Sequence, residues 1–139
     1  MNKNLSLSDI MLLRVTIKGE DFHMINIKFG VTKENLELLN NIVNEAAEYG
    51  IWSVFYGEQE ITAVDNIKNK VSSLHNESLE KNNFLLDLNF IEGQTFKKII
   101  VFYLTNNFKN LGRREFETIT DFILFVDDSL AFEIEEKGL

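Results

Sequence analysis

The sequence predicts an α+β domain, in which a mostly antiparallel sheet carries two amphipathic helices on one face, in the order ββαβαββββ. Three observations lead to this fold class. Several segments alternate between apolar and polar residues, two segments repeat apolar residues at helical spacing, and four strand-like segments follow the second helix. No repeat or linker divides the chain, so residues 1–139 are expected to form one domain, with residues 1–9 flexible.

The first two strands are predicted to form a hairpin near the N-terminus. Residues 11–18 alternate between apolar and mostly polar side chains, and residues 23–29 repeat this alternation. Gly19, Glu20 and Asp21 lie between the two segments and favour a turn. The face expected to be buried consists of Met11, Leu13, Val15, Ile17, His23, Ile25, Ile27 and Phe29.

A helix is predicted to begin after Thr32 and to end at Gly50. Thr32 is a suitable N-cap, Glu34 favours the first turn, and Gly50 is expected to end the helix in the left-handed conformation. The residues expected to be buried are Leu36, Leu39, Ile42, Val43, Ala46 and Ala47.

A central strand and a second helix are predicted to follow. Residues 51–56 (IWSVFY) are apolar on both sides, which favours a strand in the middle of the sheet. After Gly57, apolar residues recur at helical spacing as far as Leu74, and His75 suits the negative end of that helix. Its buried residues are predicted to be Ile61, Val64, Ile67, Val71 and Leu74.

Two further hairpins are predicted in the C-terminal half. Residues 84–91 and 95–104 are strand-like and flank Glu92, Gly93 and Gln94. Residues 118–126 and 129–135 form the third hairpin, with a turn at Asp127 and Asp128. Its inward side chains would be Leu130, Phe132 and Ile134, and its outward ones Ala131, Glu133 and Glu135.

A helix is the alternative for residues 113–126. Phe116, Ile119, Ile123 and Val126 would then align on one side. Such a helix would place Arg113 and Arg114 at its positive end and Asp127 and Asp128 at its negative end. Because both placements are unfavourable, the hairpin is preferred.

Acidic residues are concentrated near the C-terminus. The formal net charge is −8, and residues 115–136 hold eight carboxylates and no Lys or Arg. The preceding residues 94–114 hold five bases and no acid, so some of these charges are expected to pair. The candidate partner-binding residues are Asp121, Asp127, Asp128, Glu133, Glu135 and Glu136.

Motifs for catalysis or metal binding are missing from the sequence. It has no cysteine and no GxGxxG, GxxxxGK[ST], GxSxG or HExxH. His23 could act as a general base, but a histidine at the rim of the core is the simpler interpretation. Glu133 and Glu135 could form a pair of catalytic carboxylates, yet exposed acids on a strand typically protect a sheet edge. We therefore expect no metal, no cofactor and no enzymatic activity.

Nucleic acid and membranes are also disfavoured as partners. The acidic balance would repel phosphate groups. The aromatic residues Trp52, Phe55, Tyr56 and Tyr103 fit a core better than a base-stacking surface. The apolar run IMLL is too short for a signal peptide, and no stretch has the length of a membrane span, so a cytoplasmic location is expected.

The leading hypothesis is a non-enzymatic binding protein whose acidic surface recognises a basic protein. A small, acidic domain without cysteine or motif resembles bacterial immunity proteins and antitoxins in its overall profile, although no motif links it to a family. This profile predicts an inhibitor that neutralises a basic protein toxin. Two alternatives are a structural or adaptor subunit that forms a homodimer or larger homo-oligomer, and a small enzyme with an unfamiliar site.

Overall fold

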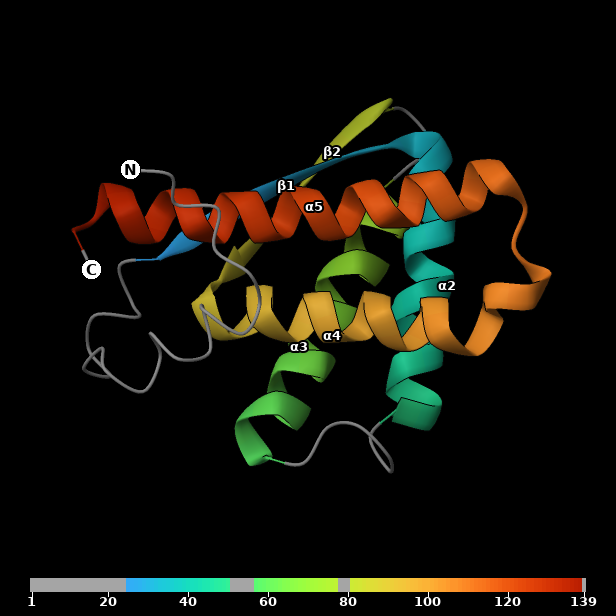
Figure 1. The fold of residues 1–139 in the computed structure, drawn as a ribbon, viewed down its shortest axis with the longest axis horizontal. Coiled ribbons are helices and arrows are strands. Elements are labelled where there is room, and N and C mark those ends of the chain that lie inside the picture. The colour runs from blue at the N-terminus through green and yellow to red at the C-terminus, as the bar shows by residue number, and fades with distance from the viewer. Residues whose placement is uncertain (1–24, 51–56, 78–80, 139) are drawn as a thin grey trace.

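The structure is a computed structural model that describes residues 25–50, 57–77 and 81–138. These residues form, in order, strand β1 (Asn26–Thr32), helix α2 (Lys33–Tyr49), helix α3 (Glu58–Asn76), strand β2 (Asn83–Asn89), helix α4 (Phe90–Asn107), the short 3₁₀-helix η3 (Phe108–Asn110) and helix α5 (Arg113–Glu136) (Figure 1). The described residues are mostly helical and contain one two-stranded sheet. The predicted fold class, a mostly antiparallel sheet of many strands with two helices, is therefore wrong.

The two strands are antiparallel and bury one face. Asn26 pairs with Asn89, and Thr32 pairs with Asn83. The buried side chains are Ile27, Phe29, Val31, Phe84, Leu86 and Leu88. The inward face predicted for Ile27 and Phe29 is thus confirmed, whereas the predicted strands at 11–18 and 51–56 lie outside the described residues.

Helices α2 and α3 confirm their predictions, with one correction at a helix end. Thr32 Oγ1 accepts a hydrogen bond from the Asn35 N–H at 3.3 Å, as an N-cap should. Gly50 ends α2 with φ −71°, so it does not adopt the predicted left-handed conformation. The central residues of both predicted stripes are buried, while Ala47, Ile61 and Leu74 are half-buried.

Helix α4 replaces the predicted strand at 95–104 and its turn. Asn89 Oδ1 accepts from the Glu92 N–H at 2.9 Å, and Glu92 Oε1 accepts from the Asn89 N–H at 3.1 Å, which begins the helix with a capping box. The helix contacts α2, α3, α5 and both strands. A helix enclosed on several sides shows no one-sided apolar stripe, so its sequence resembles a buried strand.

Gly93 allows α4 to approach its neighbours closely and does not form a turn. A Cβ atom at this position would lie 3.1 Å from Leu130 Cδ2 of α5 and 3.5 Å from Ile27 Cδ1 of β1. Figure 1 shows α4 and α5 running antiparallel, with α2 and α3 crossing behind α4. The small side chain therefore serves the packing of α4 between α5 and the sheet.

Helix α5 is continuous where the third hairpin was predicted. Asp127 and Asp128 lie inside it, so the argument that they oppose its negative end does not apply. Misplaced charges at a helix end cost about 0.3–1 kcal/mol each, whereas burial of one large apolar side chain contributes about 1.5–3 kcal/mol. Burial of one side therefore outweighs the charges at the ends, and the buried residues are Ile119, Phe122, Val126, Leu130 and Ile134.

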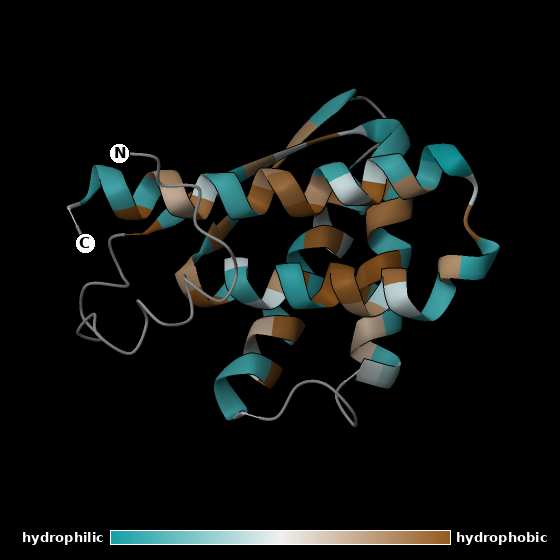
Figure 2. Cartoon of the chain, in the orientation of Figure 1, coloured by the Kyte–Doolittle hydropathy of each residue, from teal (hydrophilic) through white to brown (hydrophobic). Residues whose placement is uncertain are grey.

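Phe29 of β1 occupies the centre of the core. Its ring makes edge-to-face contacts with Phe96 of α4 and with Phe122 and Phe125 of α5, at centroid distances of 5.1, 5.2 and 5.2 Å. Figure 2 shows hydrophobic residues over the middle of α4 and a mixture of hydrophobic and hydrophilic patches along α5. One side chain thus connects the sheet with both C-terminal helices.

The environment of Tyr103 makes the free energy of unfolding depend on pH in the alkaline range. Burial raises the pKa of this phenol above its usual 10.0, and the negative charges of Glu45 and Glu115 raise the pKa further. Between the unfolded and the folded pKa, the folded state binds more protons, so the free energy of unfolding falls as pH rises.

We expect Tyr103→Phe to remove this part of the alkaline loss in stability. The measurement is urea unfolding of both proteins between about pH 8 and 11. The same substitution at Tyr49, which is 60% exposed, is the matched control. An unchanged pH dependence in Tyr103→Phe would contradict the role assigned to Tyr103.

Candidate functional site on the outer face of α5

Two of the six acids predicted to bind a partner have ion-pair partners within the chain. Asp127 Oδ1 lies 2.8 Å from Lys97 Nζ of α4, and the two side chains are 19% and 9% exposed. Asp127 Oδ1 makes no hydrogen bond within residues 25–50, 57–77 and 81–138, so the contact with Lys97 is a charge pair without hydrogen-bond alignment. Glu133 Oε1 lies 3.9 Å from Lys137 Nζ. Asp127 therefore joins α4 to α5 and does not belong to the accessible surface.

The other four acids are exposed on α5. Asp121, Asp128, Glu135 and Glu136 form no ion pair with any other described residue. Three of them, Asp121, Asp128 and Glu135, are seven residues apart, which places them along one line of a helix. The structure thus brings half of the predicted set onto one face.

Exposed apolar residues alternate with these acids. Leu124, Phe125 and Phe132 are 54%, 43% and 63% exposed. Spacings of three and four residues place Leu124 and Phe132 beside the acids, on the side of α5 opposite its buried residues. Phe125 lies at the border of this side, because its ring also contacts Phe29 of β1. We call this surface the acidic–apolar ridge, and it consists of Asp121, Leu124, Phe125, Asp128, Phe132 and Glu135.

Sequence reasoning missed the apolar half of the ridge. Phe132 was predicted to face inward on a strand beside Leu130 and Ile134, but on the helix only Leu130 and Ile134 are buried. Glu133 and Glu135 do not share a face either, because residues two apart diverge on a helix. The available signal was the spacing of Ile119, Phe122, Val126, Leu130 and Ile134, which is helical along the whole segment.

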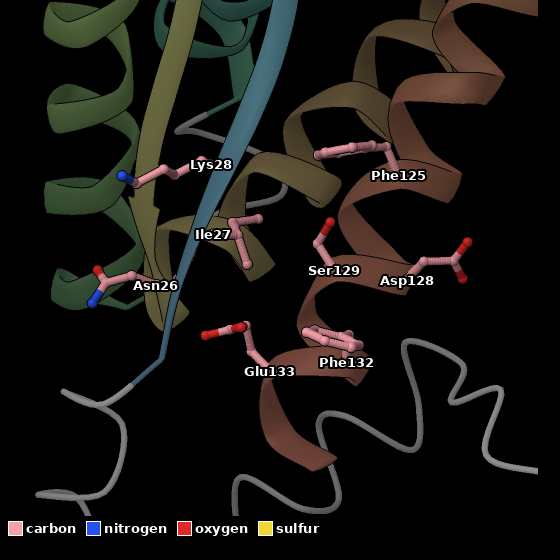
Figure 3. A pocket seen from close by; sticks show the side chains of 8 residues that line it. All are labelled: Asn26, Ile27, Lys28, Phe125, Asp128, Ser129, Phe132 and Glu133. Carbon is pink, nitrogen blue, oxygen red and sulfur yellow. The ribbon is translucent and has the colours of Figure 1, made fainter. Parts of the chain in front are cut away.

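A groove separates the ridge from β1. It has a volume of about 540 Å³ and is lined by Asn26, Ile27, Lys28, Phe125, Asp128, Ser129, Phe132 and Glu133. Figure 3 shows β2, β1 and α5 side by side in that order, with the groove between β1 and α5. Glu133 points from α5 toward β1, whereas Lys28 and Asn26 point away from α5. Asp128 points away from β1, so of the two carboxylates that line the groove, Glu133 is the one directed into it.

The basic segment 94–114 has three of its five bases in ion pairs within the fold. Lys98 Nζ lies 2.8 Å from Glu60 Oε1 of α3, and Arg113 Nε lies 3.1 Å from Glu117 Oε1 within α5. With the Lys97 pair, three of the five bases bind acids of this chain. Pairing of some of these bases with acids was predicted; the Lys97 and Lys98 pairs join α4 to α5 and to α3, whereas the Arg113 pair lies within α5.

Other candidates for chemistry are few in the part of the chain that the structure describes. A second hollow beside the start of α3 is lined by Glu58, Gln59, Thr62, Ala63, Asn66, Asn89, Ile91 and Glu92. Among residues 25–50, 57–77 and 81–138, no three His, Cys, Asp or Glu side chains gather to hold a metal ion. His75 lies in the last turn of α3, as predicted. His23 and the aromatic residues 52–56 lie outside the described ranges.

Comparisons add no functional assignment. The chain has no match to any protein-family model, curated protein or solved structure. None of the described helices has the combination of length and apolar character that crossing a bilayer requires. The class that the described residues define is a predominantly helical domain with one two-stranded sheet and an acidic–apolar ridge on its last helix.

Proposed function

We propose that this chain is a non-enzymatic binding protein, an immunity-type inhibitor that neutralises a basic protein toxin in the bacterial cytoplasm. One observation supports it above the others: on the acidic–apolar ridge, three carboxylates that form no ion pair with any described residue alternate with large apolar side chains that remain exposed. Solubility alone explains exposed acids, but it does not explain a phenylalanine that is 63% exposed between them.

The two kinds of side chain have complementary roles in such a complex. Carboxylates attract and orient a positively charged protein, which raises the rate of association. Apolar side chains that become buried on contact slow dissociation, because aromatic anchors dominate interface energies. Phe132 is the strongest candidate anchor, since it is the most exposed large apolar residue of the ridge.

Charge repulsion makes a homodimer through the ridge a weaker proposal. A symmetric contact would bring Asp121, Asp128 and Glu135 of one copy against the same residues of the other. Like charges across an interface oppose association. A basic partner would instead neutralise these carboxylates.

The test compares two variants that change the same amount of charge. In the ridge variant, Asp121, Asp128 and Glu135 are replaced by Lys, and Asp127 is retained because it pairs with Lys97. In the control variant, the exposed Glu37, Glu48 and Asp65 of α2 and α3 are replaced by Lys. The wild-type chain is used to capture basic proteins from the lysate of its native host, and the captured protein is then expressed alone.

We expect the captured protein to arrest growth and the wild-type chain to restore it. The ridge variant should associate at least about tenfold more slowly and should not restore growth, because electrostatic steering is lost. The control variant should behave like the wild type. If the ridge variant protected cells as well as the control variant, the proposal would be contradicted. A captured protein that does not arrest growth would also contradict it.

A further inference from the structure

The groove between β1 and α5 has an apolar wall. Phe125 and Phe132 line it from α5 and are 43% and 63% exposed, and Ile27 lines it from β1. Helix α5 also contacts β1 beside it, so the groove of about 540 Å³ has room for side chains and not for a further strand. An occupant of the groove therefore contributes side chains and does not extend the sheet.

The polar groups that line the groove do not favour a charged occupant. Asp128 points away from β1, and Asn26 and Lys28 point away from α5 (Figure 3). Glu133 points toward β1, but its Oε1 lies 3.9 Å from Lys137 Nζ of this chain. The groove therefore fits apolar side chains, and the water-accessible surface that they remove from the two phenylalanine rings stabilises the contact.

Apolar side chains of this kind are present in residues 11–17, which precede β1 and lie outside the described residues. The apolar residues Met11, Leu13, Val15 and Ile17 occupy every second position of this segment. In an extended segment, side chains at every second position share one face. Residues 11–17 therefore present a continuous apolar face when they are extended.

The point where this segment joins β1 places it next to the groove. Ile25 is the first described residue, and the following residue, Asn26, lines the groove. Eight peptide bonds separate Ile17 from Ile25, which keeps their Cα atoms within about 28 Å of each other. Strand β2 occupies one edge of β1, so a chain that reverses at the predicted turn 19–21 returns on the side of α5 (Figure 3). A segment tethered this closely has an effective concentration at the groove of about 1 mM.

We propose that the apolar face of residues 11–17 packs in the groove against Phe125 and Phe132 when no partner is bound. The contact is autoinhibitory, because a partner that uses Phe132 as an anchor has to displace the segment first. The acids of the ridge stay open, since Asp128 points away from the groove and Asp121 and Glu135 do not line it. The inference concerns the free chain and does not rest on the proposed function. A second copy of α5 is disfavoured as the occupant, because its carboxylates would meet those of the ridge.

The test is a disulfide crosslink in the full chain, which contains no cysteine of its own. Ser129→Cys places one thiol in the groove and retains both phenylalanines. The second thiol is introduced on the apolar face, by Leu13→Cys or Val15→Cys, or on the opposite face, by Arg14→Cys or Thr16→Cys as controls. Dilute protein is oxidised with oxidised glutathione, and the crosslinked monomer is followed by mass spectrometry of its peptides.

We expect the two apolar-face pairs to crosslink at least about fivefold faster than the two control pairs, because a disulfide forms only where the two Cβ atoms approach closely. Adding Phe132→Ala to the Val15→Cys pair should slow its crosslink about fivefold, since the apolar wall is lost. Adding Leu124→Ala, on the ridge but outside the groove, should leave the rate unchanged. Both truncated side chains are more than half exposed, at 63% and 54%, so neither change removes core packing.

Three results would overturn the inference. The first is an equal crosslinking rate for the apolar-face and control pairs, and the second is a rate that does not respond to Phe132→Ala. The third is a disulfide that forms only between two chains, which would make a second copy the occupant. Because the rates are measured without a partner, their outcome is independent of whether a basic toxin is captured.

Discussion

Phe29→Ala is expected to lower the free energy of unfolding by about 3–5 kcal/mol. The substitution removes a buried ring that touches Phe96, Phe122 and Phe125, and the cavity would lie where β1, α4 and α5 meet. A domain of this size has a total stability of about 5–15 kcal/mol, so the loss is a large fraction of it. Urea unfolding followed by circular dichroism gives the value.

Phe132→Ala is the matched control for this experiment. It removes the same side chain from a position that is 63% exposed, so we expect a change within about 0.5 kcal/mol. If the two substitutions had similar effects on the free energy of unfolding, Phe29 would not be the centre of the core. The same unfolding measurement also tests whether Phe132→Ala remains folded, which any test of its role in binding requires.

Lys97→Met is expected to destabilise the protein by about 3 kcal/mol, the lower end of the range for breaking a buried ion pair. The substitution leaves the Asp127 carboxylate, which is 19% exposed, without the ammonium group that lies 2.8 Å away. Replacement of both partners, Lys97→Met with Asp127→Leu, should recover most of this loss, because no charge then remains buried. Urea unfolding of the two single variants and the double variant gives the coupling energy.

Arg113→Met is the control for the charge experiment. It removes a pair with Glu117 in which the side chains are 92% and 61% exposed, and exposed pairs contribute under about 1 kcal/mol. If Lys97→Met lowered the free energy of unfolding no more than Arg113→Met, the Lys97–Asp127 ion pair between α4 and α5 would be energetically equivalent to an exposed surface pair. A large effect would instead show that Asp127 belongs to the framework, and its reversal could not report on partner binding.

The acidic character of the candidate site could be predicted from the sequence, whereas the positions of its side chains on α5 could not. The segment 115–136 is acidic in any conformation, so Asp121, Asp128 and Glu135 could be selected from sequence. Whether an acid lies on the surface depends on the helix, which turns Asp127 toward Lys97 and turns Phe132 outward. The groove depends in addition on the distance between α5 and β1, two elements that are far apart in the chain.

Strands β1 and β2 and helices α2 and α3 could be located from the amino-acid pattern, apart from their exact ends. Each of these elements buries one side only, so its local apolar period of two or 3.6 residues records its conformation. Helices α4 and α5 depend on contacts between elements that are distant in the chain. Helix α4 is enclosed by α2, α3, α5 and the sheet, so its sequence lacks a one-sided apolar pattern. Gly93 suggests a turn in the sequence, whereas in the structure it lies inside α4 next to Leu130 and Ile27. Helix α5 has unfavourable charges near its ends, and burial against α4 and β1 outweighs them.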